Sequence, residues 1–413
     1  MSVFFKRAAD RICKYKRKYI HHPRFAALKL AIWSFGESLK RKISIKYIYR
    51  KFFSKNAKNR HDNDDKIWIL FDTRYGIGDS IIGANYIWHF AHFINDPRVI
   101  IDVLSPQMPF ASAIFHEHSY INNLYYYEDD CPYDTYNLVI LLRRFPSIVH
   151  MANVKIFNAN LNAAIKTFQS SPISDPGENA ILQNTLTDSR ANTLCRIKGL
   201  KRIQQPDITQ LFKVGTDYKA PIFIDTDEDE CLKKFGLLGK KFITFSRECG
   251  QMLFDAESTK MWPLSHYDRL VKLLKQETNE YKIVQIGSST VYSKLIENID
   301  IDLRGKTSLE EVKVILRHSS LHIDNDSGMV HLRHALHAGP SVVMFGPTDI
   351  DIYGYPENIN IKSKNCHCFP CEWITSSWNL TCINTDNPHI CMRSIKPEDV
   401  MKEIREKFLK KQI

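Results

Sequence analysis

Two neighbouring segments late in the chain end apolar, strand-like runs in small and polar residues. The run Leu321-His322-Ile323 ends in Asp-Asn-Asp-Ser-Gly and passes at once into a helical pattern, and the run Val342–Phe345 ends in Gly-Pro-Thr. A strand that turns directly into a helix leaves backbone N–H groups without partners at the positive end of the helix dipole, where they attract anions. Two such ends side by side at the carboxyl edge of a parallel sheet are where nucleotides bind. The alternative is that they are ordinary strand ends of an α/β protein.

Strand-like and helix-like patterns alternate through most of the chain. Strand-like runs fall at residues 67–71, 99–104, 138–142, 241–245, 282–287, 321–323 and 342–345, and helical spacing at 80–93, 265–274, 308–317, 329–337 and 397–410. The alternation predicts doubly wound parallel sheets in two α/β halves, with the cleft between them as a favoured place for a substrate. A polar stretch with several prolines, at about 168–220, could contain a long surface excursion.

A length of 413 residues fits two domains. We expect an N-terminal extension over residues 1–60, a first Rossmann-like domain over 61–235, and a second over 236–413 that includes a cysteine cluster and a C-terminal helix.

The positive charge is concentrated at the start of the chain. Residues 1–60 contain eighteen Lys and Arg against two acids, a net charge of +16, so that the rest sums to −5 within the total of +11. The acidic body argues against a nucleic-acid partner. The extension mixes its cations with aromatic and aliphatic residues, as basic helices at membrane interfaces do, where each surface cation contributes about 1 kcal/mol of attraction to anionic lipid. We therefore expect contact with an anionic membrane surface; helices packed on the body, nucleic-acid binding and disorder are the alternatives.

The sequence also predicts a location. No apolar run is long enough to span a bilayer, and the extension has neither the apolar core nor the cleavage site of a signal peptide. We expect a cytoplasmic protein, peripheral on the inner face of the cytoplasmic membrane.

Five of the ten cysteines fall between Cys366 and Cys391. Their spacing suits a tetrahedral thiolate site, made most simply by Cys368, Cys371, Cys382 and Cys391, with zinc as the default metal and iron as the alternative. Four protein ligands would leave no open position, so such a metal would be structural. Reduced thiols without a metal are the other interpretation.

Six short motifs, taken in chain order, resemble those of glycosyltransferase family 9, the ADP-heptose:lipopolysaccharide heptosyltransferases. They are Arg-Tyr-Gly-Ile-Gly-Asp at 74–79, Ser-Thr-Lys-Met-Trp-Pro at 258–263, Leu-Arg-Gly-Lys-Thr-Ser-Leu at 303–309, Asn-Asp-Ser-Gly-Met-Val-His at 325–331, Phe-Gly-Pro-Thr-Asp at 345–349 and Cys-Met at 391–392. The resemblance covers about residues 66–410. It implies the GT-B fold, in which two Rossmann-like domains face a central cleft, here with a basic helical N-terminal extension added.

The resemblance places Asp79 on the acceptor side. The aspartate of this motif is the general base proposed in the family, and a positioned carboxylate that takes the proton of an acceptor hydroxyl contributes about 10²–10⁴ in rate. Gly76 and Gly78 would form the acceptor-side loop that carries it. The alternative is that Asp79 is only an acid that stabilises the start of a helix.

The donor-binding residues that the resemblance implies are Lys260, Asp326, Ser327, Gly328, His331, Gly346 and Thr348. Lys260 matches the family lysine that binds the donor phosphates, where a fixed cation stabilises a departing diphosphate. A solvated surface lysine is the alternative for Lys260, and an interior histidine for His331. Trp262 is expected in the core.

Two segments depart from the family pattern. The loop 246–259 is rich in charged and sulfur-containing residues, and Ser288-Ser289-Thr290 stand where an acidic residue for the ribose is expected. The donor could therefore be another nucleotide sugar. No Asp-x-Asp carboxylate pair stands out as the site of a catalytic Mg²⁺, so we expect metal-independent transfer without a catalytic cofactor.

These observations predict an inverting glycosyltransferase that moves heptose from ADP-heptose to a lipopolysaccharide core acceptor, with Asp79 as the base. A protein acceptor, such as a secreted adhesin, is the alternative within this class. A non-catalytic membrane- or nucleic-acid-binding protein with a metal knuckle is the alternative from another class.

Overall fold

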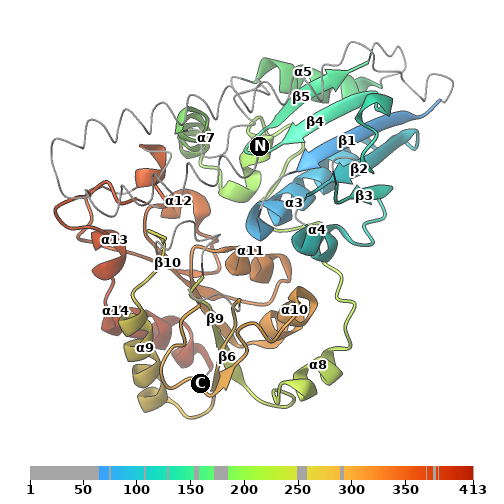
Figure 1. Ribbon diagram of the computed structural model, residues 1–413. Helices are drawn as coiled ribbons and strands as arrows, with labels where there is room; N and C mark the ends of the chain where they lie inside the picture. Colours follow the sequence, from blue (N-terminus) through green and yellow to red (C-terminus); the bar gives the residue numbers. More distant parts are fainter. Residues whose placement is uncertain are drawn as a thin grey trace, which may run out of the picture.

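The frame of the molecule is a pair of β-sheets with helices packed on them (Figure 1). The computed structural model describes residues 65–73, 76–106, 108–127, 130–152, 158–171, 185–248, 258–288, 293–368, 370–374, 378–379 and 381–412. The expected basic helical extension over residues 1–60, with its membrane contact, lies outside these residues.

The first sheet is doubly wound. It contains β1 (Ile67–Thr73), β2 (Val99–Leu104), β3 (Asn123–Tyr125), β4 (Leu138–Leu142) and β5 (Pro146–Met151), in the order β3-β2-β1-β4-β5. The first four strands pair in parallel. β5 runs antiparallel to β4, because only residues 143–145 separate the two strands and so short a connection can only reverse the chain. Every residue of β4 is buried, as expected of a strand covered on both faces.

The second sheet is parallel throughout. It contains β6 (Phe242–Phe245), β7 (Lys282–Gln285), β8 (Ile301–Asp302), β9 (Leu321–Asn325), β10 (Ser341–Phe345) and β11 (Ile359–Lys362), in the order β11-β10-β9-β6-β7-β8. The chain starts in the middle at β6, runs out to one edge, and returns to the other side at β9. The position between β6 and β9 is therefore the topological switch point, where ligands of such sheets bind. In the first sheet the equivalent position lies between β1 and β4.

The helices that precede β6 in the chain are α3 (Ile77–Ile94), α4 (Met108–Phe115), α5 (Ala159–Ser170), α7 (Thr185–Lys198) and α8 (Glu228–Lys234). Those that follow β6 are α9 (Leu264–Glu277), α10 (Leu309–His318), α11 (Gly328–Ala335), α12 (Ile350–Tyr353), α13 (Ile390–Arg393) and α14 (Pro397–Lys407). Short 3-10 turns lie at η2 (Tyr133–Thr135), η3 (Arg202–Asp207), η4 (Cys371–Trp373) and η5 (Leu409–Gln412).

Local sequence explains where several helices begin and which face they bury. α10 starts with a capping box, in which Ser308 Oγ accepts the N–H of Glu311 and the Glu311 carboxylate accepts the N–H of Ser308. α14 carries proline at its first position, where the missing N–H costs nothing. α9 buries Tyr267, Leu270, Val271 and Leu274, a spacing that places all four on one face.

The two halves contact each other where α3 and α11 begin (Figure 1). A Cβ atom on Gly328 would lie 2.0 Å from Cγ2 of Ile77, and one on Gly78 would lie 2.7 Å from Cδ2 of His331. Glycine at both positions therefore allows the two helix starts to approach closely. Ile77 and Val330 belong to one buried apolar cluster that runs through both halves.

Most of the fold expected from the sequence is confirmed, with differences in detail. α3 begins at Ile77, three residues before the expected helix, so that Asp79 lies in its first turn. The expected surface excursion is wrong for residues 200–220, which contribute Ile203, Phe212, Val214 and Tyr218 to the core. The division at residues 235 and 236 stays a prediction. Among the described residues, no helix combines the length and apolarity needed to cross a membrane.

Candidate active site

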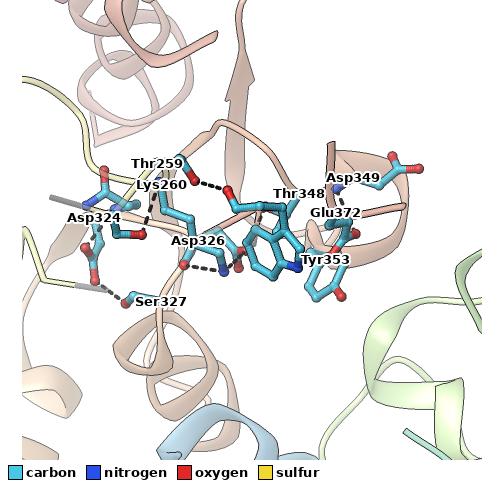
Figure 2. A network of polar contacts seen from close by, with 12 residues as sticks. Thr259, Lys260, Asp324, Asp326, Ser327, Thr348, Asp349, Tyr353 and Glu372 are labelled. Carbon is cyan, nitrogen blue, oxygen red and sulfur yellow. Dashed lines mark hydrogen bonds and ion pairs between the residues drawn. The ribbon is translucent and has the colours of Figure 1, made fainter. Parts of the chain in front are cut away.

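Three predicted donor-side residues meet at the switch point of the second sheet (Figure 2). Lys260 follows β6, Asp326 follows β9 and Thr348 follows β10. Lys260 Nζ donates to Asp326 Oδ2 at 2.7 Å, and the Thr348 hydroxyl donates to the same oxygen at 2.8 Å. Burial opposes the charge of Asp326, but Lys260, His331 and Thr348 favour it more strongly, so that the pKa of Asp326 lies below its usual value. The site therefore holds an ammonium–carboxylate pair at neutral pH.

Hydrogen bonds among buried polar groups fix the start of α11. Ser327 is the N-cap residue, and its hydroxyl accepts the N–H of Met329 at 3.1 Å. The same hydroxyl donates to the carboxylate of Asp324, which is fully buried and also accepts the N–H of Asn325 at 2.7 Å. His322 Nε2 lies 3.3 Å from Oδ2 of Asp324, the oxygen to which the Ser327 hydroxyl donates. The turn that would bind phosphate is thus fixed before any ligand arrives.

Gly346 is required by packing. A Cβ atom on this residue would lie 2.7 Å from the sulfur of Met392 and 3.2 Å from the carbonyl oxygen of Thr259. The motif pair Phe345-Gly346 and Cys391-Met392 therefore meets in space, although more than forty residues separate the two in the sequence. Trp262 is fully buried, which confirms its place in the core.

Asp79 lies in the first turn of α3, on the opposite side of the contact between the halves. Its side chain is 39% exposed, and its Oδ1 accepts from Nη2 of Arg202 at 2.7 Å. Burial opposes ionisation of the carboxyl group, but the charges of Arg202, Arg144 and His331 outweigh it, so that the pKa of Asp79 lies below its usual value. Gly76 is the N-cap residue of α3 and provides no side-chain cap, while Asp79 bonds to Arg202 instead of to its own helix.

His331 lies between the two groups of residues. It is 8% exposed, and its Nδ1 lies 2.6 Å from the hydroxyl oxygen of Tyr355. Burial lowers the pKa of His331 to about 4, even though the carboxylates of Asp326 and Asp79 act in the opposite direction. A neutral imidazole therefore stands between the anionic Asp79 and the anionic Asp326 at pH 7. The structure brings together the acceptor-side and donor-side residues that the sequence placed on separate segments.

The sequence did not identify four polar or aromatic residues as part of this region: Arg144, Arg202, Glu248 and Trp378. Arg144 follows β4 and so lies at the switch point of the first sheet, and its Nη1 donates to the Tyr353 hydroxyl at 2.9 Å. Trp378, in the cysteine-rich loop, lies under Lys260, with the ammonium nitrogen 5.3 Å from the ring centroid. The position of Arg144 directly after a strand was a usable signal; those of Arg202 and Trp378 gave none.

Glu248 corrects one expectation about the second sheet. An acidic residue was expected after Gly287 and is absent from the sequence there. A carboxylate nevertheless lies next to this segment. It belongs to Glu248, which follows the neighbouring strand β6 and accepts the N–H of Ser288 at 2.9 Å. The carboxylate thus comes from the next strand of the sheet.

The cysteine-rich loop gathers its thiols in one place. Sγ of Cys366 lies 3.5 Å from Sγ of Cys368, the Cys371 thiol donates to the Cys368 carbonyl at 3.1 Å, and the Cys382 sulfur accepts the N–H of His389 at 3.2 Å. Cys371 and Cys391 are buried. Burial raises the pKa of Cys366 to about 11, with the neighbouring thiols adding to the shift. Sulfur donors are the ligands that zinc and iron prefer, although no three of these thiols lie within 4.8 Å of one another in the described part of the chain.

A different trio in the described part of the chain, His116, Glu117 and Asp225, brings its ligand atoms within 4.8 Å of one another. All three side chains are exposed, and His116 Nε2 lies 3.5 Å from the carboxylate of Glu117 and 3.4 Å from that of Asp225. This trio is distant in sequence from the predicted cysteine ligands.

The protein has two doubly wound sheets, and charged side chains lie at the switch point of each. The starts of α3 and α11 pack against each other between the sheets. These features define a two-domain protein of the GT-B type. Two solved structures support this class. The ADP-heptose lipopolysaccharide heptosyltransferase II of E. coli matches with a TM-score of 0.52 at 17% identity, over 84% of this chain and 100% of that chain. The iron-containing dodecameric glycosyltransferase TibC of enterotoxigenic E. coli matches with a TM-score of 0.54 at 14% identity, over 84% of this chain and 81% of that chain.

The sequence comparisons point to the same class. Residues 209–380 match the model of glycosyltransferase family 9 (heptosyltransferase). Lipopolysaccharide heptosyltransferase 1 of Campylobacter coli is 29% identical over 162 residues, which are 37% of this chain and 44% of that protein. Lipooligosaccharide heptosyltransferase 2 of Campylobacter jejuni is 29% identical over 158 residues, or 36% and 47%. The chain thus matches less than half the length of these curated relatives.

Proposed function

We propose that this protein is an inverting glycosyltransferase that moves heptose from ADP-heptose to a lipopolysaccharide core acceptor. The observation that carries the proposal is that an ionised, partly exposed carboxylate, Asp79, and the Lys260–Asp326 pair lie on either side of the packed starts of α3 and α11, with His331 near both carboxylates. Family 9 relatives named as heptosyltransferases, and a structure of TibC in complex with ADP-D-beta-D-heptose, support heptose as the sugar.

The proposed reaction needs one base and one group of phosphate donors. Asp79 takes the proton of the acceptor hydroxyl while that oxygen forms a bond to the anomeric carbon of the donor sugar. The bond from this carbon to the phosphate oxygen breaks, and its electron pair leaves with the nucleoside diphosphate. Attack from the side opposite the leaving group inverts the anomeric configuration.

The leaving diphosphate is proposed to bind at the start of α11. The ammonium group of Lys260 would donate to a phosphate oxygen as well as to Asp326. The Thr348 hydroxyl and the backbone N–H groups at Ser327 and Gly328 would supply further donors. His331 is neutral at pH 7, so it adds no positive charge that would lower the basicity of the Asp79 carboxylate.

The acceptor is proposed to reach Asp79 from a membrane. The +16 charge of residues 1–60 suits an anionic surface, and a lipid-linked acceptor stays in that surface. The cytoplasmic face of the cytoplasmic membrane is the corresponding location.

We also propose that Cys368, Cys371, Cys382 and Cys391 hold a structural iron or zinc ion, with iron supported by the likeness in fold to the iron-containing TibC. A bound ion would fix the loop that carries Trp378 and Glu372. The metal content of purified protein tests this: Cys371→Ser should lose the metal and lower the melting temperature, whereas Cys231→Ser, which changes a buried thiol outside the loop, should keep it. Full metal occupancy in Cys371→Ser would overturn the assignment.

The function is tested by incubating the purified protein with ADP-heptose and either a purified lipopolysaccharide core lipid or candidate acceptor proteins, with products followed by mass spectrometry. Asp79→Asn keeps an oxygen acceptor for Arg202 but removes the charge opposite the buried guanidinium, so we expect a lower melting temperature. The folded variant should still bind ADP but lose transfer by about 10²–10⁴-fold. Unchanged transfer by Asp79→Asn would reject Asp79 as the base. Absence of both ADP binding and transfer in the unaltered protein would favour the non-catalytic alternative.

A further inference from the structure

Arg202 contacts Asp79 and is far more buried than Asp79. Its side chain is 3% exposed, whereas that of Asp79 is 39% exposed. Nη2 donates to Asp79 Oδ1 at 2.7 Å, while Nε and Nη1 have no hydrogen-bond partner among the residues that the structure describes. Arginine keeps its proton in proteins, so a buried guanidinium requires an anion. The carboxylate of Asp79 is that anion.

The segment that carries Arg202 is itself fixed. Arg202 opens η3, in which Ile203 and Gln205 are fully buried. Gln205 donates to Asn192 Oδ1 at 3.0 Å, and Asp207 accepts the N–H of Val214 at 3.2 Å. With its neighbours held on both sides, the guanidinium cannot swing away from Asp79 without disturbing the core.

We propose that Arg202 is a positioning residue for the acceptor-side base: it holds Oδ1 of Asp79 and thereby turns Oδ2 toward the acceptor hydroxyl. This rests on the proposed function, in which Asp79 takes the acceptor proton. Within the described residues Oδ2 forms no hydrogen bond, and the carboxylate is the exposed member of the pair. A carboxylate tied at one oxygen has one free oxygen in a defined direction, which is the requirement for a base that must meet a hydroxyl at hydrogen-bond distance.

Arg144 does not fill the same role. Both arginines favour the ionised form of Asp79, but only Arg202 forms a hydrogen bond to it within the described chain, and Nη1 of Arg144 is bonded to the Tyr353 hydroxyl. Arg144 therefore contributes charge at a distance, whereas Arg202 contributes both charge and direction.

The pH profile of transfer tests the proposal. Removing the cation in Arg202→Gln leaves burial as the main influence on Asp79, so its pKa rises and the acidic limb of kcat/KM moves to higher pH, by on the order of one pH unit. The turnover number at neutral pH should fall by about 10- to 100-fold through loss of orientation, while the Kd for ADP stays within about two-fold. Arg269→Gln is the matched control, because it breaks an exposed ion pair with Glu398 and should leave both the limb and the rate unchanged.

Arg202→Lys covers the case in which the glutamine variant fails to fold. The ammonium keeps the charge but loses the planar geometry of the guanidinium, so the rate should fall at least about tenfold with a smaller movement of the acidic limb than in Arg202→Gln. An unmoved acidic limb in folded Arg202→Gln, or a wild-type rate in Arg202→Lys, would overturn the role of Arg202. If Asp79→Asn is fully active, the proposed function fails first and the positioning role falls with it.

Discussion

The two charged pairs of the candidate site differ in how they are satisfied. On the donor side, Oδ2 of Asp326 accepts from both Lys260 and Thr348, and the carboxylate is 5% exposed. On the acceptor side, Asp79 accepts from Arg202 at one oxygen and is 39% exposed. A buried carboxylate with several donors is suited to organising cations around a phosphate. An exposed carboxylate with one fixed oxygen is suited to taking a proton.

The pairs also differ in how they are assembled. Asp326 directly follows β9, and Lys260 lies in the connection from the neighbouring strand β6 to α9, so the sheet topology places both at the same edge. Asp79 and Arg202 are 123 residues apart and meet through η3, which packs against α3 outside the strand pattern. Changes on the two sides should therefore have separable effects, and the following substitutions test that separation.

The largest effect is expected where the two sides touch. Gly328→Ala places a methyl group 2.0 Å from Cγ2 of Ile77, so that α3 and α11 must move apart. Overpacking of this kind costs about 1–3 kcal/mol or more, and it disturbs both sides at once. We expect a melting temperature lowered by several degrees, with weaker ADP binding and near-complete loss of transfer.

Gly76→Ala is the control for that substitution. Gly76 has φ −67°, and no described residue lies within 4 Å of the position of an added Cβ. Its melting temperature and activity should stay close to those of the unaltered protein. Equal losses in both variants, measured by thermal unfolding and calorimetry, would mean that the close approach of the helices is not the cause.

A smaller, one-sided effect is expected from Lys260→Ala. It leaves the carboxylate of Asp326 without its cation and removes a charged donor from the phosphate site, a loss of about 1.5–3 kcal/mol in ADP binding, or roughly ten- to a hundred-fold in Kd. The acidic limb of the pH profile should stay in place, because it reports Asp79. Lys272→Ala, which breaks an exposed pair with Glu297, provides the control for calorimetry. A shift of the limb without loss of ADP affinity would contradict the separation of the two sides.

The smallest effect concerns His331 and stability in mild acid. Its pKa is about 4 in the folded protein against an ordinary value of 6.5, so between these pH values the unfolded chain binds the extra proton and the folded one does not. The contribution of His331 to stability is complete above about pH 6.5 and declines as pH falls toward 4, by on the order of 1–2 kcal/mol.

Chemical denaturation at pH 7 and pH 5 measures this. The free energy of unfolding should fall between the two values, and in His331→Gln it should fall by less. An identical decrease in both proteins would show that other groups cause the loss.

Much of the fold was accessible from the sequence, because alternating apolar runs and helical spacing report the burial of each segment directly. The strands β6, β7, β9 and β10 and the polar residues after β9 and β10 were predicted for that reason, whereas the short edge strands β8 and β11 were not. β5 was not expected as an antiparallel edge strand, since its sequence, Pro146–Met151, has no long apolar run. The stretch around η3 was expected on the surface because it is polar and contains Pro206, yet its polar side chains are buried with partners of their own.

The sequence by itself determined which residues stand at strand ends and helix starts, since those positions depend on local periodicity and on glycine. The resemblance of the motifs at those positions to glycosyltransferase family 9 then specified Asp79, Lys260, Asp326 and Thr348 as candidates. Only the tertiary structure decided that Arg202 supports Asp79, that Trp378 lies under Lys260, and that Gly78 and Gly328 face each other. These contacts join segments that are distant along the chain, and their geometry is set by how helices and loops pack, which no local pattern records.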